Sequence, residues 1–221
     1  MIYRNLAFIT VLSVTLLSGC LGAKPEEKLY VAFENAAKQE KKMYEDTKKL
    51  AELEKQGQEL YTQITLEGKE NNQVVKEKLD QAVTNINDRE KVLEKEKATL
   101  ENAQNEVKSV DNYIKKLEDK KVQEQAEKVQ DMYKNRAESF KKLHDDYKKS
   151  LQLEQELYKM LQEKDEKLKS IHEKVKTVNQ SYEQIHSDQD KFNTYTNEYN
   201  QNKLAFYKQA NINIKEGKKI N

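Results

Sequence analysis

Apolar residues recur at alternating intervals of three and four along most of the chain, and this spacing predicts α-helices. Residues spaced in this way share one face of a helix and form a seam that other helices must cover. The first such series contains Leu29, Phe33, Ala36, Met43, Leu50, Leu53, Leu60 and Ile64. Charged residues make up 36% of the sequence, so without this seam the chain would be expected to be disordered. The seam instead predicts an all-α fold.

Three interruptions divide the periodic sequence into four pieces. Gly68 and the asparagines after it are helix stop signals, and the step from Leu117 to Val122 breaks the rhythm. A charged run at 163–167 marks a third position without breaking the rhythm. We therefore expect turns near 68–72, 118–121 and 164–167. The pieces are each about 43–46 residues, or about 65–70 Å at 1.5 Å per residue.

Four helices of equal length with short links predict an elongated antiparallel up-and-down four-helix bundle. The alternative is a three-helix fold with one very long helix, because the rhythm continues through 164–167. That helix would leave half of its seam uncovered, so we favour the turn.

Several polar residues also fall on the seam. They are Arg89, Glu96, Arg136, Glu154, Lys164 and Gln189. Long charged side chains can lay their apolar stems along a seam while their heads stay in water. We therefore expect a thin core with these heads in solvent.

The first nineteen residues differ from the rest of the chain. Arg4 is the only charged residue before Lys24, and residues 6–17 are almost wholly apolar. A basic start followed by a short apolar run indicates a signal peptide, and the run is shorter than the roughly 20 residues that span a bilayer. The segment 17–20, Leu-Ser-Gly-Cys, resembles the bacterial lipobox, in which the cysteine receives a diacylglyceryl group and the chain is cut just before it. The alternatives are a plain secretory signal or an uncleaved anchor.

This reading divides the chain into four parts. They are a lipoprotein signal peptide (1–19), a lipidated tether (20–25), a helical bundle domain (26–212) and a C-terminal tail (213–221). Two acyl chains on Cys20 would hold the protein at the outer face of the cytoplasmic membrane. Cys20 is the only cysteine, so its lipidation leaves no thiol for a disulfide, a metal site or a nucleophile.

The sequence offers little catalytic chemistry. Arg4 is the only charge in the signal, so 39 basic and 39 acidic residues remain after it, and this balance argues against a nucleic-acid partner. His144, His172 and His186 lack metal-ligand spacing, and we interpret them as exposed residues on helices. The pairs Asp145-Asp146 and Asp188-Asp190 are best explained as parts of solvated helix faces. We therefore expect no enzyme, no metal and no cofactor.

Twelve tyrosines are the unusual feature of the composition. Four of them fall in the seam: Tyr133, Tyr147, Tyr182 and Tyr199. Tyr195, Tyr199 and Tyr207 cluster near the C-terminal end with Asn193, Asn197, Asn200 and Asn202. A tyrosine offers a flat face and a hydroxyl, so we consider Tyr195, Tyr199 and Tyr207 as possible glycan or peptide contacts. The alternative is bundle core with scattered surface aromatics.

Four segments in this order resemble the YkyA-type cell-wall-binding lipoproteins of Gram-positive bacteria. They are Pro25-Glu26-Glu27-Lys28 behind the lipobox, the stretches 87–96 and 153–162, and Phe192-Asn193-Thr194-Tyr195-Thr196. The resemblance covers most of the mature chain and implies an all-helical bundle at the cell envelope that binds the wall. It supplies no catalytic or ligand residues.

The expected function is a membrane-anchored extracytoplasmic lipoprotein that acts as a non-enzymatic wall-binding module. The alternative is a protein-partner or regulatory coiled-coil module for an envelope enzyme or transporter, with an exposed seam serving as a groove for a helix. The expected partners are the membrane, through the diacylglyceryl group on Cys20, and either a wall polymer or an envelope protein.

Overall fold

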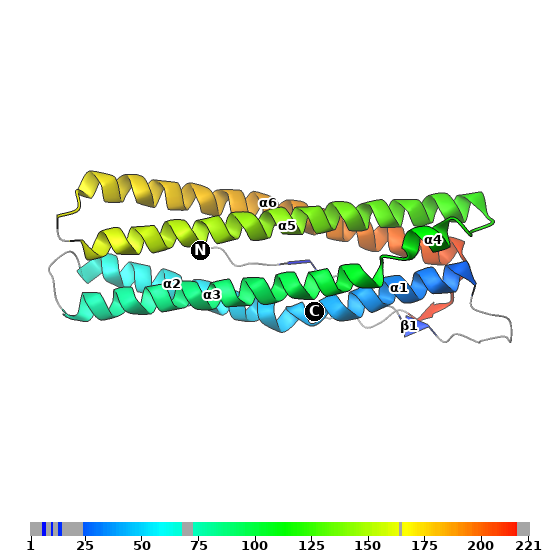
Figure 1. Ribbon diagram of the computed structural model, residues 1–221, viewed down its shortest axis with the longest axis horizontal. Coiled ribbons are helices and arrows are strands. Elements are labelled where there is room, and N and C mark those ends of the chain that lie inside the picture. Colours follow the sequence, from blue (N-terminus) through cyan, green and yellow to red (C-terminus); the bar gives the residue numbers. More distant parts are fainter. Residues whose placement is uncertain are drawn as a thin grey trace. The chain divides into compact units, whose positions relative to one another are not determined.

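The computed structural model describes residues 6–7, 10, 13–14, 24–67, 73–163 and 165–215. Its elements are β1 (Ser13–Val14), α1 (Pro25–Glu40), α2 (Met43–Glu67), α3 (Gln73–Glu106), α4 (Val110–Ile114), α5 (Lys120–Gln162), α6 (Leu168–Gln209) and β2 (Ile214–Lys215) (Figure 1). Helices dominate this part of the chain, so the predicted all-α fold is confirmed. The two short strands, which pair antiparallel with each other, were not predicted.

The chain divides into two compact units, each made of segments from several helices. Unit 1 contains Glu45–Lys97 and Phe140–Asp190, and therefore most of α2 and α3, the end of α5 and the beginning of α6. Unit 2 contains Ala7–Tyr44, Ala98–Ser139 and Lys191–Asn221, which supply α1, α4 and the remaining parts of α3, α5 and α6. Within unit 1, α2 and α3 run side by side as an antiparallel hairpin (Figure 1). Sequence reasoning treated 26–212 as one bundle domain.

The predicted turns lie close to their expected places. The helix α2 ends at Glu67 and α3 begins at Gln73, while the residues between them lie outside the described part. The break between α5 and α6 falls at 163–167, so the three-helix alternative with one very long helix is wrong. The turn before α5 falls at 115–119, slightly earlier than expected, because the Asp119 side chain begins the helix. Its Oδ1 accepts hydrogen bonds from the backbone N–H groups of Lys121 (2.8 Å) and Val122 (3.2 Å).

Two further helix breaks were not predicted. The helix α1 ends at Glu40 and α2 begins at Met43, where the apolar series jumps from Ala36 to Met43. The helix α3 ends at Glu106 and α4 begins at Val110. Apolar residues keep the three-four rhythm across this second break, so the pattern contains no signal for it.

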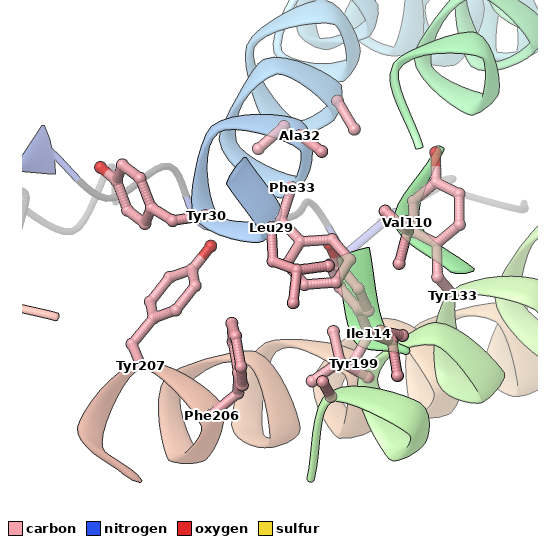
Figure 2. Close-up of a cluster of buried hydrophobic side chains, with 14 of the residues drawn as sticks. Leu29, Tyr30, Ala32, Phe33, Val110, Ile114, Tyr133, Tyr199, Phe206 and Tyr207 are labelled. Atoms are coloured by element: carbon pink, nitrogen blue, oxygen red, sulfur yellow. The ribbon is translucent and has the colours of Figure 1, made fainter. Parts of the chain in front are cut away.

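Aromatic side chains form the core of unit 2. Phe33 of α1 packs edge-on against Tyr199 and Phe206 of α6, with ring centroids 6.3 Å and 6.1 Å away (Figure 2). Tyr30 meets Tyr207 in the same way at 5.1 Å. Such edge-to-face pairs stabilise a core beyond their buried area. The N-terminus of α1 and the end of α6 therefore pack as one cluster.

The charged seam residues are buried, so the expectation that their heads reach solvent is wrong. Arg89, Glu96 and Arg136 are 3%, 0% and 1% exposed. Each one has a polar partner on a facing helix of its own unit, which offsets part of the cost of burying its charge. The partners are Glu154 for Arg89, Thr47 for Glu96 and Glu40 for Arg136. Lys164 lies outside the described residues.

Candidate functional site

A cavity of about 450 Å³ lies within unit 1. Residues of α2, α3, α5 and α6 line it, and they include Glu54, Gly57, Tyr61, Arg89, Glu154, Tyr158, Val178, Tyr182, Glu183 and His186. Its size falls in the usual range for small-ligand sites, which combine apolar walls with a few polar groups. We call it the unit 1 cavity and take it as the candidate binding site.

A buried ion pair supplies the most strongly charged part of the cavity lining. Both terminal nitrogens of Arg89 contact the Glu154 carboxylate, and Nη1 also donates to the Tyr182 hydroxyl at 2.9 Å. Burial alone would lower the pKa of Arg89, but the Glu154 carboxylate raises it above its ordinary value. The pair is therefore charged and held in a fixed, forked geometry.

Tyrosines and aliphatic side chains supply the apolar part of the lining. Tyr61 of α2 and Tyr182 of α6 are half-buried, whereas Tyr158 of α5 is buried. Burial raises the pKa of both Tyr61 and Tyr158, so their hydroxyls are neutral at physiological pH. Leu157, Val175 and Val178 complete these walls. Flat neutral rings beside aliphatic groups suit a sugar ring or an alkyl chain.

Gly57 makes a close approach between α2 and α3 possible at the edge of the cavity. A Cβ atom placed there would lie 2.8 Å from Asn85 Oδ1. Asn85 is buried, and its Nδ2 donates to the Leu53 carbonyl oxygen at 2.9 Å, which fixes its side chain. A glycine inside a helix costs about 1 kcal/mol relative to alanine, so its presence here is explained by this contact.

The lining carries more negative than positive charge. Glu54, Glu154 and Glu183 contribute carboxylates, and Arg89 is the one Lys or Arg among the described lining residues. The Glu54 carboxylate accepts a hydrogen bond from the Tyr147 hydroxyl at 2.6 Å. Counted formally, three carboxylates and one guanidinium give the described lining two more negative than positive charges. The cavity therefore favours neutral or cationic ligands over anions.

The tyrosines predicted as contacts lie in unit 2, and two of them are core residues. Tyr199 and Tyr207 are both 0% exposed in the aromatic cluster (Figure 2), as the alternative of a bundle core expected for the seam residue Tyr199. They fall on the inner face of α6, where they pack against α1 and α5. Tyr195 is half-buried. A glycan or peptide contact at this end of α6 stays a prediction for Tyr195.

Two of the asparagines near this cluster contact the N-terminal segment. Asn193 Oδ1 accepts from the Ala7 N–H at 2.7 Å, and Asn200 Oδ1 accepts from the Thr10 N–H at 3.0 Å. Lys203 donates to the Thr10 carbonyl oxygen at 2.6 Å and to Glu34 at 2.7 Å. All three contacts to the segment are made with its backbone.

The histidines and paired aspartates behave as structural groups. His144 is 2% exposed, which corrects its expected place on the surface, whereas His172 and His186 are exposed. Asp146 and Asp188 both contact Lys142 Nζ, at 2.7 Å, so they neutralise a lysine. Within the described ranges, no group of three or more His, Cys, Asp or Glu residues could hold a metal ion.

Sequence reasoning missed the unit 1 cavity because its lining is scattered from Glu54 to His186 over four helices. Arg89, Glu154 and Tyr182 were correctly placed on the seam, but the pattern contains no information about which seam residues meet. Gly57 was the available signal, since it is a glycine in the middle of an otherwise uninterrupted helical series. Cys20 lies outside the described residues. No helix in the part that is described is long and apolar enough to cross a membrane.

The fold and the cavity define a class of all-helical bundle proteins with a small-ligand cavity between the helices. A family model named YkyA, described as "Putative cell-wall binding lipoprotein", matches residues 24–209. The chain belongs to this family.

One solved structure shares the fold. It is a crystal structure at 1.6 Å of a conserved protein of unknown function from Staphylococcus aureus, 21% identical in sequence, with a TM-score of 0.67. The similarity covers 85% of this chain and 98% of the staphylococcal one. No curated protein matches the sequence. At this identity the likeness supports the helical fold alone.

Proposed function

We propose that this protein is a lipoprotein tethered through Cys20 at the outer face of the cytoplasmic membrane, where it binds the cell wall without catalysing a reaction. Membership of the family supports a location in the cell envelope. The observation that carries the binding role is the unit 1 cavity, with tyrosine walls and a fixed Arg89–Glu154 pair.

The chemistry of the cavity supports binding rather than catalysis. Glu154 is engaged by Arg89 through two nitrogens, and Glu54 accepts a hydrogen bond from Tyr147. Catalysis by a pair of carboxylates needs one that is held protonated and one that is ionised. One carboxylate paired with a guanidinium and one that accepts a hydrogen bond, both beside neutral phenols, suit the recognition of a ligand.

Sedimentation with purified peptidoglycan tests the binding role. We expect Tyr61→Ala to lower retention on the polymer about tenfold, the loss expected for one aromatic contact. Tyr44→Ala is the matched control, because Tyr44 is also half-buried on α2 but lies outside the cavity. Retention of the wild type no greater than that of an unrelated helical bundle would contradict wall binding.

Tethering through Cys20 is tested separately. We expect metabolic labelling with a radioactive fatty acid to mark the wild type but not Cys20→Ala, and the variant to leave the membrane fraction. Labelling that persists in Cys20→Ala would contradict the assignment.

A protein-partner role is the second candidate, and one observation favours it. Leu66, Val74 and Leu168 are 81%, 47% and 75% exposed beside the two helix connections of unit 1. Large apolar side chains that are exposed to solvent suit contact with another protein. Crosslinking in cells discriminates the two roles: one dominant protein partner, lost in Leu66→Asp, would support the second, and crosslinks spread over many proteins would contradict it.

A further inference from the structure

We propose that the unit 1 cavity selects a primary ammonium group carried on an otherwise neutral sugar or peptide chain. This inference rests on the proposed wall-binding function and specifies its ligand chemistry.

Charge gives the cavity its preference for cations. The described residues that line it include three carboxylates and one guanidinium, and the guanidinium is already paired with Glu154. Glu183 is exposed on α6 and adds a carboxylate at the rim. A phosphate or carboxylate polymer would be repelled by this lining, whereas an ammonium group would be attracted.

The tyrosines strengthen this preference. Tyr61, Tyr158 and Tyr182 come from three different helices and line one cavity. The face of a neutral phenol ring attracts a cation, and the attraction grows when the cation is withdrawn from water. The same rings stack on the apolar face of a sugar or along an alkyl chain. A ligand that has both an ammonium group and a neutral body can therefore interact with the carboxylates and with the tyrosine rings of the lining.

Arg89 does not turn the cavity into an anion site. Its Nη1 and Nη2 contact the Glu154 carboxylate, Nη1 also donates to the Tyr182 hydroxyl, and its Nε is buried from solvent. The neutral part of the ligand therefore rests on the tyrosine and aliphatic walls of the cavity.

Titration calorimetry on the full chain tests the proposal with two matched pairs of probes. One pair is the methyl glycoside of glucosamine and its N-acetyl form; the other is a tripeptide with one lysine and with both termini blocked, and its Nε-acetyl form. Each pair differs in the amine alone. We expect the amine form of at least one pair to bind about tenfold more tightly than the acetylated form. The pair that binds identifies whether the amine belongs to a sugar or to a peptide.

Variants locate the binding within the cavity. Glu183→Gln should weaken the amine form several-fold and leave the acetylated form unchanged. Glu173→Gln is the matched control, since it removes an exposed carboxylate from the same helix outside the cavity. Tyr182→Phe should retain amine binding, because the ring stays in place. Because both glutamates are exposed, we expect both variants to fold, and a change in affinity then reports on ligand binding.

The outcomes separate the inference from the proposed function. Equal affinity for the amine and acetylated forms overturns amine selection and leaves wall binding intact. Sedimentation with peptidoglycan but no binding of any probe also overturns it. Failure of both assays overturns the proposed function as well. Weakening by Glu183→Gln and Glu173→Gln alike would show a general charge effect and would contradict a site in the cavity.

Discussion

Arg136 Nη2 lies 2.6 Å from Glu40 Oε2 in the core of unit 2, with the two side chains 2% and 1% exposed. Arg136 also donates through Nε to Thr196 Oγ1 at 2.8 Å and lies over the Phe192 ring at 4.6 Å. Glu40 is the last residue of α1 and lies on its buried face, one turn after Ala36 and Ala37. Burial raises the pKa of Glu40 even though Arg136 opposes the shift. This pair is therefore a polar junction among α1, α5 and α6.

Removing one partner of this pair should destabilise the protein strongly. We expect Arg136→Met to lower the free energy of unfolding by about 3–5 kcal/mol, because it leaves the Glu40 carboxyl buried without its partner. The double variant Glu40→Leu/Arg136→Met should recover most of the loss. Urea unfolding followed by circular dichroism measures both. Lys134→Met, at an exposed position of the same helix, is the control and should change little; an equal loss in the double and single variants would contradict the interpretation.

Gly57→Ala should destabilise the protein despite the better helix propensity of alanine. The new methyl group would displace Asn85, and the buried hydrogen bond from Asn85 to Leu53 would be lost. That loss is about 1–3 kcal/mol, against a propensity gain of about 1 kcal/mol. Thermal unfolding should therefore show a net loss of about 1 kcal/mol. In an Asn85→Ala background the same substitution should stabilise the protein, and a loss in both backgrounds would show that the contact with Asn85 is not the cause.

Asp146 should contribute stability that disappears in acid. Partial burial opposes the charged form, but hydrogen bonds from Lys142 and Lys149 outweigh it and lower the pKa of Asp146 to about 2. A carboxyl whose folded pKa is depressed stabilises the protein above its unfolded pKa, about 3.8, and this contribution is lost as the pH falls towards 2. Urea unfolding of wild type and Asp146→Asn should therefore differ at neutral pH and converge between pH 4 and 2. Asp131→Asn, at an exposed position of α5, is the control; a difference that persists at pH 2 would contradict the assignment.

The sequence pattern predicts helices well because helix formation depends on local spacing. The series from Leu29 to Ile64 and from Val122 to Leu161 predict helices that the structure contains, and the turn at 163–167 follows from length alone. The pattern does not say how far a polar seam residue lies from a facing helix. It therefore identified Arg89 and Arg136 on the seam but placed their heads in water, whereas carboxylates on other helices meet them.

The candidate site was harder to predict for the same reason. Tyrosine content drew attention to Tyr199 and Tyr207, yet both rings are 0% exposed and pack in the core of unit 2. Tyr61, Tyr158 and Tyr182 line the unit 1 cavity because of how their three helices pack against one another. Neither the spacing of apolar residues nor the composition encodes that packing. Gly57, a glycine inside a helix, is a signal in the sequence that could have pointed to this region.

The buried tyrosines of unit 2 should make the protein unstable in alkali. Burial raises the pKa of Tyr133, Tyr199 and Tyr207 well above the ordinary value of 10. In the unfolded chain these phenols lose protons near pH 10, while in the folded protein they keep them, so stability falls as the pH rises above about 10. Absorbance of tyrosinate should show a fraction of the tyrosines that titrates only as the helical signal is lost. In urea all should titrate near pH 10. Tyr199→Phe should reduce the slope of the alkaline decline in stability, and a slope equal to that of the wild type would contradict the role of this residue.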